Sequence, residues 1–144
     1  MVVTLRFEEA RKVIIEQVRA GARPGTEQIP LEEAAWRVLA EPVVADRDYP
    51  PLPRSIRDGF AVRSQDLPGT LKVRAEVRAG QNYTGAIGPG EAVEIMTGAP
   101  VPEGADQIVM VEHVERSCDR ITTDRPPKPG EFINPRGSEA KKGE

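Results

Sequence analysis

The chain has 144 residues and a formal net charge of −3, with 38% hydrophobic and 4% aromatic residues. This balance is typical of a globular protein with an aliphatic core, and it excludes a global basic field for nucleic acid or an acidic membrane. No apolar run reaches the roughly 20 residues that span a bilayer. Cys118 is the only cysteine, and a signal-peptide pattern is lacking. We therefore expect a cytoplasmic protein without nucleic-acid or membrane partners.

The beginning of the chain has the pattern of two amphipathic helices. The first is predicted over residues 4–20, with Thr4 as its N-cap and Gly21 just after its end. The second is predicted over residues 31–39, with acidic residues near its start and small or aliphatic residues on one side. Trp36 would then either cover that apolar side or contact another chain.

After residue 42 the composition changes, because most of the 13 glycines and 14 prolines lie there. Proline interrupts helices, and glycine and proline mark turns, so this part predicts short strands joined by turns. The clearest strand alternates Leu71, Val73, Ala75 and Val77 with charged residues, which indicates one buried and one solvated face. The predicted strands cover residues 60–62, 71–77, 92–96, 107–114 and 119–123. The fold class expected is α+β, with N-terminal helices before a β-rich lobe of short, mostly antiparallel strands.

Residues 53–62 contain the first segment that could carry chemistry. Asp58-Gly59 is a strong turn signal, and Arg54, Arg57 and Arg63 surround its carboxylate. Such a cluster could bind an oxyanion through the guanidinium groups while Asp58 holds a metal ion. A plain turn with a solvated aspartate is the alternative.

Two further segments have a similar character. A strand runs into Thr97-Gly98-Ala99 and is followed by two prolines, which suits close approach to an anionic ligand or, alternatively, a rigid loop. Farther on, Arg136, Ser138 and Glu139 could serve a phosphate or metal, or belong to a solvated connector. A structural zinc site is not expected, since the single histidine has no zinc-ligand spacing around it.

Taken in order, these segments resemble the MoeA/gephyrin family of molybdopterin molybdenumtransferases. That family has a Ser-Ala-Met-Asp-Gly-Tyr-Ala segment, and its second motif, Met-Thr-Gly-Ala-Pro-Val-Pro, is reproduced in full at residues 96–102 and followed by Gly-Ala-Asp. The first motif is matched at Ser55, Asp58, Gly59 and Ala61, with Phe60 in place of tyrosine. The family also has a later Arg-Gly-Glu-Asp segment, which reads Arg136-Gly137-Ser138-Glu139 here. The departures from the family pattern are Ile56 and Arg57 ahead of the aspartate, and Glu139 where an aspartate is usual.

The resemblance implies a homodimeric enzyme that inserts molybdenum from molybdate into adenylylated molybdopterin, releasing AMP with the help of Mg²⁺. It also implies catalytic roles for Asp58 and Thr97, and metal binding by Asp58 and Glu139. Substrate binding is implied for Ser55, Gly59, Gly98 and Arg136. Residues 1–45 would form a helical dimerisation region, rejoined by about residues 134–144, and residues 46–133 the β-rich lobe.

In this family the pterin-binding α/β domain follows the N-terminal part, and it is absent from these 144 residues. We therefore expect no transferase turnover from this chain alone. The main alternative is a non-catalytic MoeA-like binding or scaffold module, and a further one is a soluble α+β domain of unknown role. The sequence encoded downstream of Glu144 would separate them, because an intact α/β domain favours the enzyme.

Overall fold

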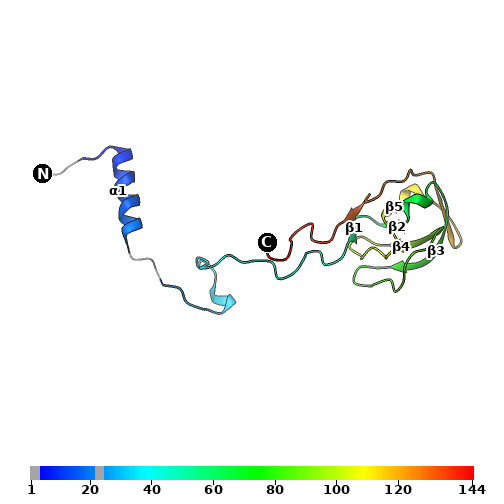
Figure 1. Ribbon diagram of the computed structural model, residues 1–144, viewed down its shortest axis with the longest axis horizontal. Coiled ribbons are helices and arrows are strands. Elements are labelled where there is room, and N and C mark those ends of the chain that lie inside the picture. Colours follow the sequence, from blue (N-terminus) through cyan, green and yellow to red (C-terminus); the bar gives the residue numbers. More distant parts are fainter. Residues whose placement is uncertain (1–3, 22–24) are drawn as a thin grey trace. The chain divides into compact units, whose positions relative to one another are not determined.

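The computed structural model describes residues 4–21 and 25–144, and the chain forms two compact units, Met1–Pro42 and Val43–Glu144 (Figure 1). Among the residues that the structure describes, the first unit contains one α-helix and the second contains the strands. The α+β class expected from the sequence is confirmed. No helix in the described part of the chain is long and apolar enough to cross a membrane.

Helix α1 spans Phe7–Ala20, so it begins later than predicted. Its N-cap is Arg6 rather than Thr4, because the Glu9 carboxylate accepts a hydrogen bond from the backbone N–H of Arg6 at 2.9 Å and so caps the first turn. The end is where the sequence placed it, since the N–H of Gly21 donates to the carbonyl of Gln17 at 2.9 Å and the chain then leaves the helix.

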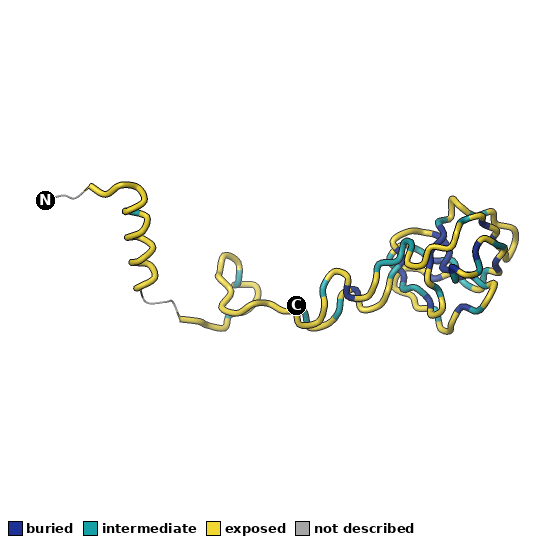
Figure 2. Tube along the Cα trace, turned by 45° about the horizontal axis from the view of Figure 1, so that its top comes forward, coloured by how far each residue is buried: buried dark blue, intermediate teal, exposed yellow. Residues whose placement is uncertain are grey.

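The second predicted helix is wrong. Within residues 31–39 the structure has only the short 3₁₀ turn η1, Leu31–Glu33, and Trp36 has a φ of 67°, which no α-helix contains. Trp36 is fully exposed and covers no apolar face. Nine residues make a helix that is marginal in water without packing, and no described residue of the first unit is buried (Figure 2). Helix α1 is longer and has its own cap, which favours it over the second segment.

The second unit is built on a six-stranded sheet with the order β5-β2-β4-β3-β7-β6. All neighbouring pairs are antiparallel except β3 and β4, so the expectation of mostly antiparallel strands is confirmed. The bounds are β2 Gly59–Val62, β3 Gly69–Val77, β4 Glu91–Ile95, β5 Gln107–Met110, β6 Glu115–Ser117 and β7 Arg120–Thr123. A separate antiparallel pair joins β1, Arg54–Ser55, to β8, Ile133–Asn134.

The predicted strands agree with the sheet except at three places. The strand predicted over residues 107–114 ends at Met110, where the chain turns into the 3₁₀ segment η3, Val111–His113. Strand β6 follows it and pairs with β7 through a tight turn at Cys118, which has a φ of 53° and is exposed. Strands β1 and β8 were not predicted, since two residues are too few to show an alternating pattern.

The core lies on both faces of strand β2, all four residues of which are buried. Phe60 and Val62 belong to one cluster of buried side chains, and Ala61 between them belongs to the other. Successive residues of a strand point to opposite faces, so β2 is covered on both sides. A central strand of this kind holds the turn just before it, at Asp58, against a rigid support.

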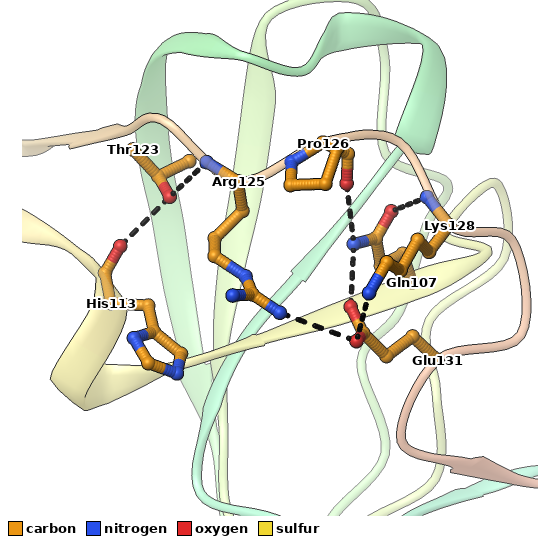
Figure 3. A network of polar contacts seen from close by, with 7 residues as sticks. All are labelled: Gln107, His113, Thr123, Arg125, Pro126, Lys128 and Glu131. Carbon is orange, nitrogen blue, oxygen red and sulfur yellow. Dashed lines mark hydrogen bonds and ion pairs between the residues drawn. The ribbon is translucent and has the colours of Figure 1, made fainter.

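A polar network closes the edge of the sheet beside β5 (Figure 3). Gln107 is fully buried, and its amide donates to the carbonyl of Pro126 at 3.2 Å and to the Glu131 carboxylate at 3.1 Å. Its amide oxygen accepts the backbone N–H of Lys128 at 2.7 Å, and Glu131 also pairs with Arg125 at 3.4 Å. These contacts fix residues 125–131, which lead directly into β8.

The first and last segments of this unit form a two-stranded ribbon. The backbone N–H of Ala45 donates to the carbonyl of Glu144 at 2.9 Å, and the N–H of Tyr49 donates to the carbonyl of Ala140 at 2.7 Å. The N–H of Gly137 completes the ribbon by donating to the carbonyl of Pro50 at 2.9 Å. Residues 137–144 thus pair with residues 45–50 inside the second unit, while the functional division of the chain proposed from the resemblance stays a prediction.

Candidate functional site

Asp58 and Thr97 form a direct contact although they are 39 positions apart in the chain. Oδ1 of Asp58 accepts two hydrogen bonds from Thr97, one from the backbone N–H at 2.7 Å and one from the hydroxyl at 2.7 Å. Both residues are exposed. The pairing therefore presents an oriented carboxylate at the surface, with Oδ2 free of hydrogen-bond partners among the described residues.

Glycines on both sides make this approach possible. Gly59 follows Asp58 directly and begins β2, where an added Cβ would overlap the carbonyl oxygen of Val109. Gly98 follows Thr97 with a φ of 83°, a backbone region that side chains other than glycine rarely adopt. The two positions explain why Asp-Gly and Thr-Gly occur here: each glycine lets a polar neighbour sit on a sharply turning, closely packed backbone.

The three segments singled out from the sequence meet at Ser55. Its backbone N–H donates to the carbonyl of Ala99 at 3.0 Å, and its carbonyl accepts the N–H of Gly98 at 2.8 Å. On its other side Ser55 pairs with Ile133, next to Asn134 in strand β8. The first segment therefore lies between the second and the start of the third. The hydroxyl of Ser55 is buried and donates to the carbonyl of Arg57 at 2.5 Å, so it holds the turn from within.

The hydrogen bonds from Thr97 stabilise the charged form of Asp58. The backbone N–H of Thr97, and next its hydroxyl, hold the pKa of Asp58 below its ordinary value. A carboxyl group with a lowered folded-state pKa stabilises the fold at pH values above its ordinary pKa, and this contribution is lost as the pH falls through the lowered value. Asp58 is therefore ionised throughout the neutral range.

The third segment has its polar side chains engaged with one another and with the ribbon. Arg136 donates through Nε to Asp48 at 2.7 Å, and the backbone N–H of Lys142 donates to the same carboxylate at 3.0 Å. Glu139 is exposed and accepts the side-chain amide of Asn134 at 3.1 Å. Arg136 and Glu139 thus flank the chain just after β8. They are connected to Asp58 through the strand pair β1–β8 and the Ser55 turn.

The donor set suits a metal that needs few protein ligands. Within the described residues, no group of three or more His, Cys, Asp or Glu side chains is arranged to hold a metal ion. Mg²⁺ is commonly bound by one or two carboxylates, with water and substrate phosphates completing its shell. Asp58 could supply one such oxygen, because only its Oδ1 is occupied by Thr97.

Asp106, the last residue of the Gly-Ala-Asp that follows the second motif, has a structural role. Its Oδ1 accepts the backbone N–H of Ser64 at 2.6 Å, and its Oδ2 accepts the Ser64 hydroxyl at 2.7 Å. These bonds fasten the start of the 3₁₀ segment η2, Ser64–Asp66, immediately after β2. The carboxylate of Asp106 thus helps to shape the lobe, while Thr97 within the second motif holds the carboxylate of Asp58.

Sequence reasoning missed two residues that shape the site. Phe132 has a φ of 59°, and its ring packs against the buried cluster that contains Ala61. Its carbonyl accepts the N–H of Ile56 at 3.0 Å, which ties it to the Asp58 turn. Asp48 receives both Arg136 and Lys142, and nothing in its charged sequence surroundings distinguishes it from a solvated residue.

Solved structures place this architecture in a known class. A molybdopterin biosynthesis MoeA protein from Pyrococcus horikoshii superposes with a TM-score of 0.80 at 35% identity, covering 92% of this chain and 36% of that one. A second crystal structure of a MoeA protein from this organism gives a TM-score of 0.76 at 39% identity, with 82% and 33% covered. The lobe and its loops are therefore of the kind found in MoeA proteins.

The sequence comparisons lead to the same family. The model of the MoeA N-terminal region (domain I and II) matches residues 5–144, and the chain belongs to this family. A molybdopterin molybdenumtransferase of Haemophilus influenzae is 37% identical over 143 residues, which cover 97% of this chain and 35% of the relative. One from Nostoc is 39% identical over 115 residues, covering 75% and 26%. The chain spans about a third of the length of these relatives, and the resemblance seen in its motifs is confirmed.

Proposed function

We propose that this chain is the N-terminal part of an enzyme that inserts molybdenum from molybdate into adenylylated molybdopterin, giving molybdenum cofactor and AMP. The observation that carries the proposal is the Asp58–Thr97 pair, which sets an ionised carboxylate and a hydroxyl at the surface where the two most distinctive motifs meet. The relatives that support the proposal are named molybdopterin molybdenumtransferases. The lone exposed Cys118 is compatible with the cytoplasm, which we propose as the location.

In this proposal the loops supply charge and orientation. Molybdate and the adenylylated pterin are anionic, so their reaction requires neutralisation and positioning of oxygens. Asp58 would supply an oxygen ligand to Mg²⁺, and the bound ion would offset the negative charge of the substrates. Thr97 fixes the carboxylate of Asp58, while Ser55, Gly59 and Gly98 shape the two turns. Arg136 and Glu139 are proposed as more peripheral contacts, to a substrate oxygen and to the metal.

Complementation tests the function directly. The complete gene is expected to restore molybdoenzyme activity in a strain that lacks molybdopterin molybdenumtransferase. The matched negative control is the same gene carrying Asp58→Ala, which removes the surface carboxylate. An absence of rescue by the complete gene, with the protein present at normal level, would favour a scaffold module. Equal rescue by both versions would leave the reaction in place and remove Asp58 from the site.

We propose further that the first unit forms a homodimer. Phe7, Ile14 and Val18 lie on one side of α1, at a spacing close to two turns and then one turn of helix. Their exposed fractions are 78%, 62% and 74%. Large apolar side chains that remain open on a helix typically mark an interface with another protein chain. A second copy of this chain is the occupant that the resemblance implies.

A double substitution tests the dimer in the product of the complete gene. Ile14→Glu with Val18→Glu is expected to raise the dimer dissociation constant by at least roughly 100-fold, because burial of each of the two side chains is worth about 1.5–3 kcal/mol and each 1.4 kcal/mol is about tenfold. Analytical ultracentrifugation measures this change. Glu16→Gln removes a charge at an exposed position on the opposite side of the same helix and should leave the dimer intact. A wild-type protein that sediments as a monomer at all concentrations would contradict the proposal.

A further inference from the structure

Arg57 occupies an unusual electrostatic position in the second unit. Seven arginines of Val43–Glu144 form ion pairs with carboxylates, including Arg116 with Glu94 at 2.8 Å. Arg57 forms none in this fully described part of the chain, although Asp58 is its immediate neighbour. The Asp58 carboxylate is held by Thr97 instead, so the two opposite charges stand side by side in the sequence without neutralising each other.

The backbone of Arg57 is fixed from two sides. Its carbonyl accepts the Ser55 hydroxyl at 2.5 Å, and its own N–H donates to the same hydroxyl oxygen at 3.3 Å. The neighbouring Ile56 donates to the carbonyl of Phe132 at 3.0 Å. The side chain of Arg57 therefore extends from a turn whose backbone is held by hydrogen bonds on both sides.

The guanidinium of Arg57 also lies over an aromatic ring, that of Phe132. Its central carbon lies 6.0 Å from the centre of the Phe132 ring, within the range of a cation–π contact. That ring packs against a buried cluster and is anchored to the core. An aromatic face attracts the cation but satisfies none of its N–H donors, so an exposed guanidinium resting there keeps its hydrogen-bonding edges for a ligand.

We propose that Arg57 binds an oxyanion of the substrates, next to the metal-binding carboxylate of Asp58. Guanidinium forms paired, charge-assisted hydrogen bonds with the oxygens of tetrahedral anions, which suits molybdate and a phosphate of the adenylylated pterin alike. The ionised Asp58 by itself repels both anions, and a cation one residue away offsets that repulsion. This inference rests on the proposed function, because it names the residue that would receive the anion at that site.

Equilibrium binding to the product of the complete gene tests the role of Arg57. Arg57→Met keeps an apolar side chain over Phe132 and removes the charge. It is expected to raise the dissociation constant for one of the two anions, molybdate or adenylylated molybdopterin, by roughly tenfold. Separate titrations with each compound show which of the two Arg57 contacts. Arg57→Lys, which retains the charge, is expected to lose less affinity than Arg57→Met.

The matched control is Arg120→Met, which removes the same charge from an exposed strand residue that also has no ion pair in the second unit. It should leave both dissociation constants unchanged. Unaltered affinity of Arg57→Met for both compounds, in a protein that binds and turns over normally when unsubstituted, would overturn the role of Arg57 alone. Equal losses in Arg57→Met and Arg120→Met would also overturn it, since only the global charge would then matter. An unsubstituted protein that neither binds nor converts the substrates would overturn the proposed function, and this inference with it.

Discussion

Replacing Asp58 by asparagine in the product of the complete gene is expected to lower kcat for molybdenum insertion by roughly 100-fold, the loss typical when one preorganised electrostatic contact is removed. Asparagine keeps an oxygen that can accept both hydrogen bonds of Thr97, so the turn should remain folded. The substitution removes the negative charge and replaces the carboxylate oxygen that is proposed as a ligand of Mg²⁺. Release of AMP from adenylylated molybdopterin, followed at saturating Mg²⁺, measures the change.

A control substitution and the pH dependence separate the site from the scaffold. Glu76→Gln on β3 removes an exposed carboxylate that pairs with Arg78, and it should leave kcat unchanged. In the unsubstituted enzyme, activity that depends on ionised Asp58 should persist below the ordinary pKa of a carboxyl group, because Thr97 lowers the pKa of Asp58. Retention of full activity by Asp58→Asn would show that the carboxylate takes no part in the reaction.

Gly59→Ala is expected to destabilise the second unit by about 3 kcal/mol, at the upper end of the range for overpacking a well-packed core. The added methyl group would overlap the carbonyl oxygen of Val109 and lie 2.9 Å from the Cα atom of Met110. Both are backbone atoms of strand β5, which pairs with β2, so they cannot move aside as a flexible side chain would. Urea denaturation of the 144-residue chain, followed by circular dichroism, measures the loss.

Gly25→Ala is the matched control for this substitution. The same methyl group at Gly25 has no atom within 4 Å and should change the unfolding free energy little. A stability of Gly59→Ala equal to that of Gly25→Ala would mean that β2 and β5 can separate at no cost. That result would contradict the assignment of β2 as the rigid support of the Asp58 turn.

The sequence predicted those parts of the fold in which the local pattern and the tertiary contacts agree. The alternation of residues 71–77 survives in β3, where Leu71 and Val77 are buried and Lys72 and Arg74 are exposed. The region of residues 31–39 shows the opposite case. Its composition favours a helix, but a helix of that length depends on a packing partner, which the described residues of the first unit do not provide.

The candidate site was predictable in its members and only partly in its geometry. The motifs named Asp58 and Thr97, and the structure brings these two side chains together. The substrate contact that the resemblance implies for Ser55 stays a prediction, and the structure shows its hydroxyl donating to the carbonyl of Arg57 within its own turn. That turn depends on the pairing of β1 with β8, and strands of two residues leave no periodic signal in the sequence. The contact between the Arg57 guanidinium and the Phe132 ring could not be predicted from the sequence either, because Phe132 lies in a segment without any motif.

The ribbon between residues 45–50 and 137–144 brings the first and last segments of the lobe together. Because Ala45 and Glu144 are hydrogen-bonded neighbours, the two ends of the lobe lie at one place on its surface. A lobe whose two ends are neighbours can be exchanged between relatives, or altered in size, without moving the points at which it is attached to the rest of a larger protein. Variation in its loops is then free to follow the chemistry of the ligand and need not follow the architecture of its host.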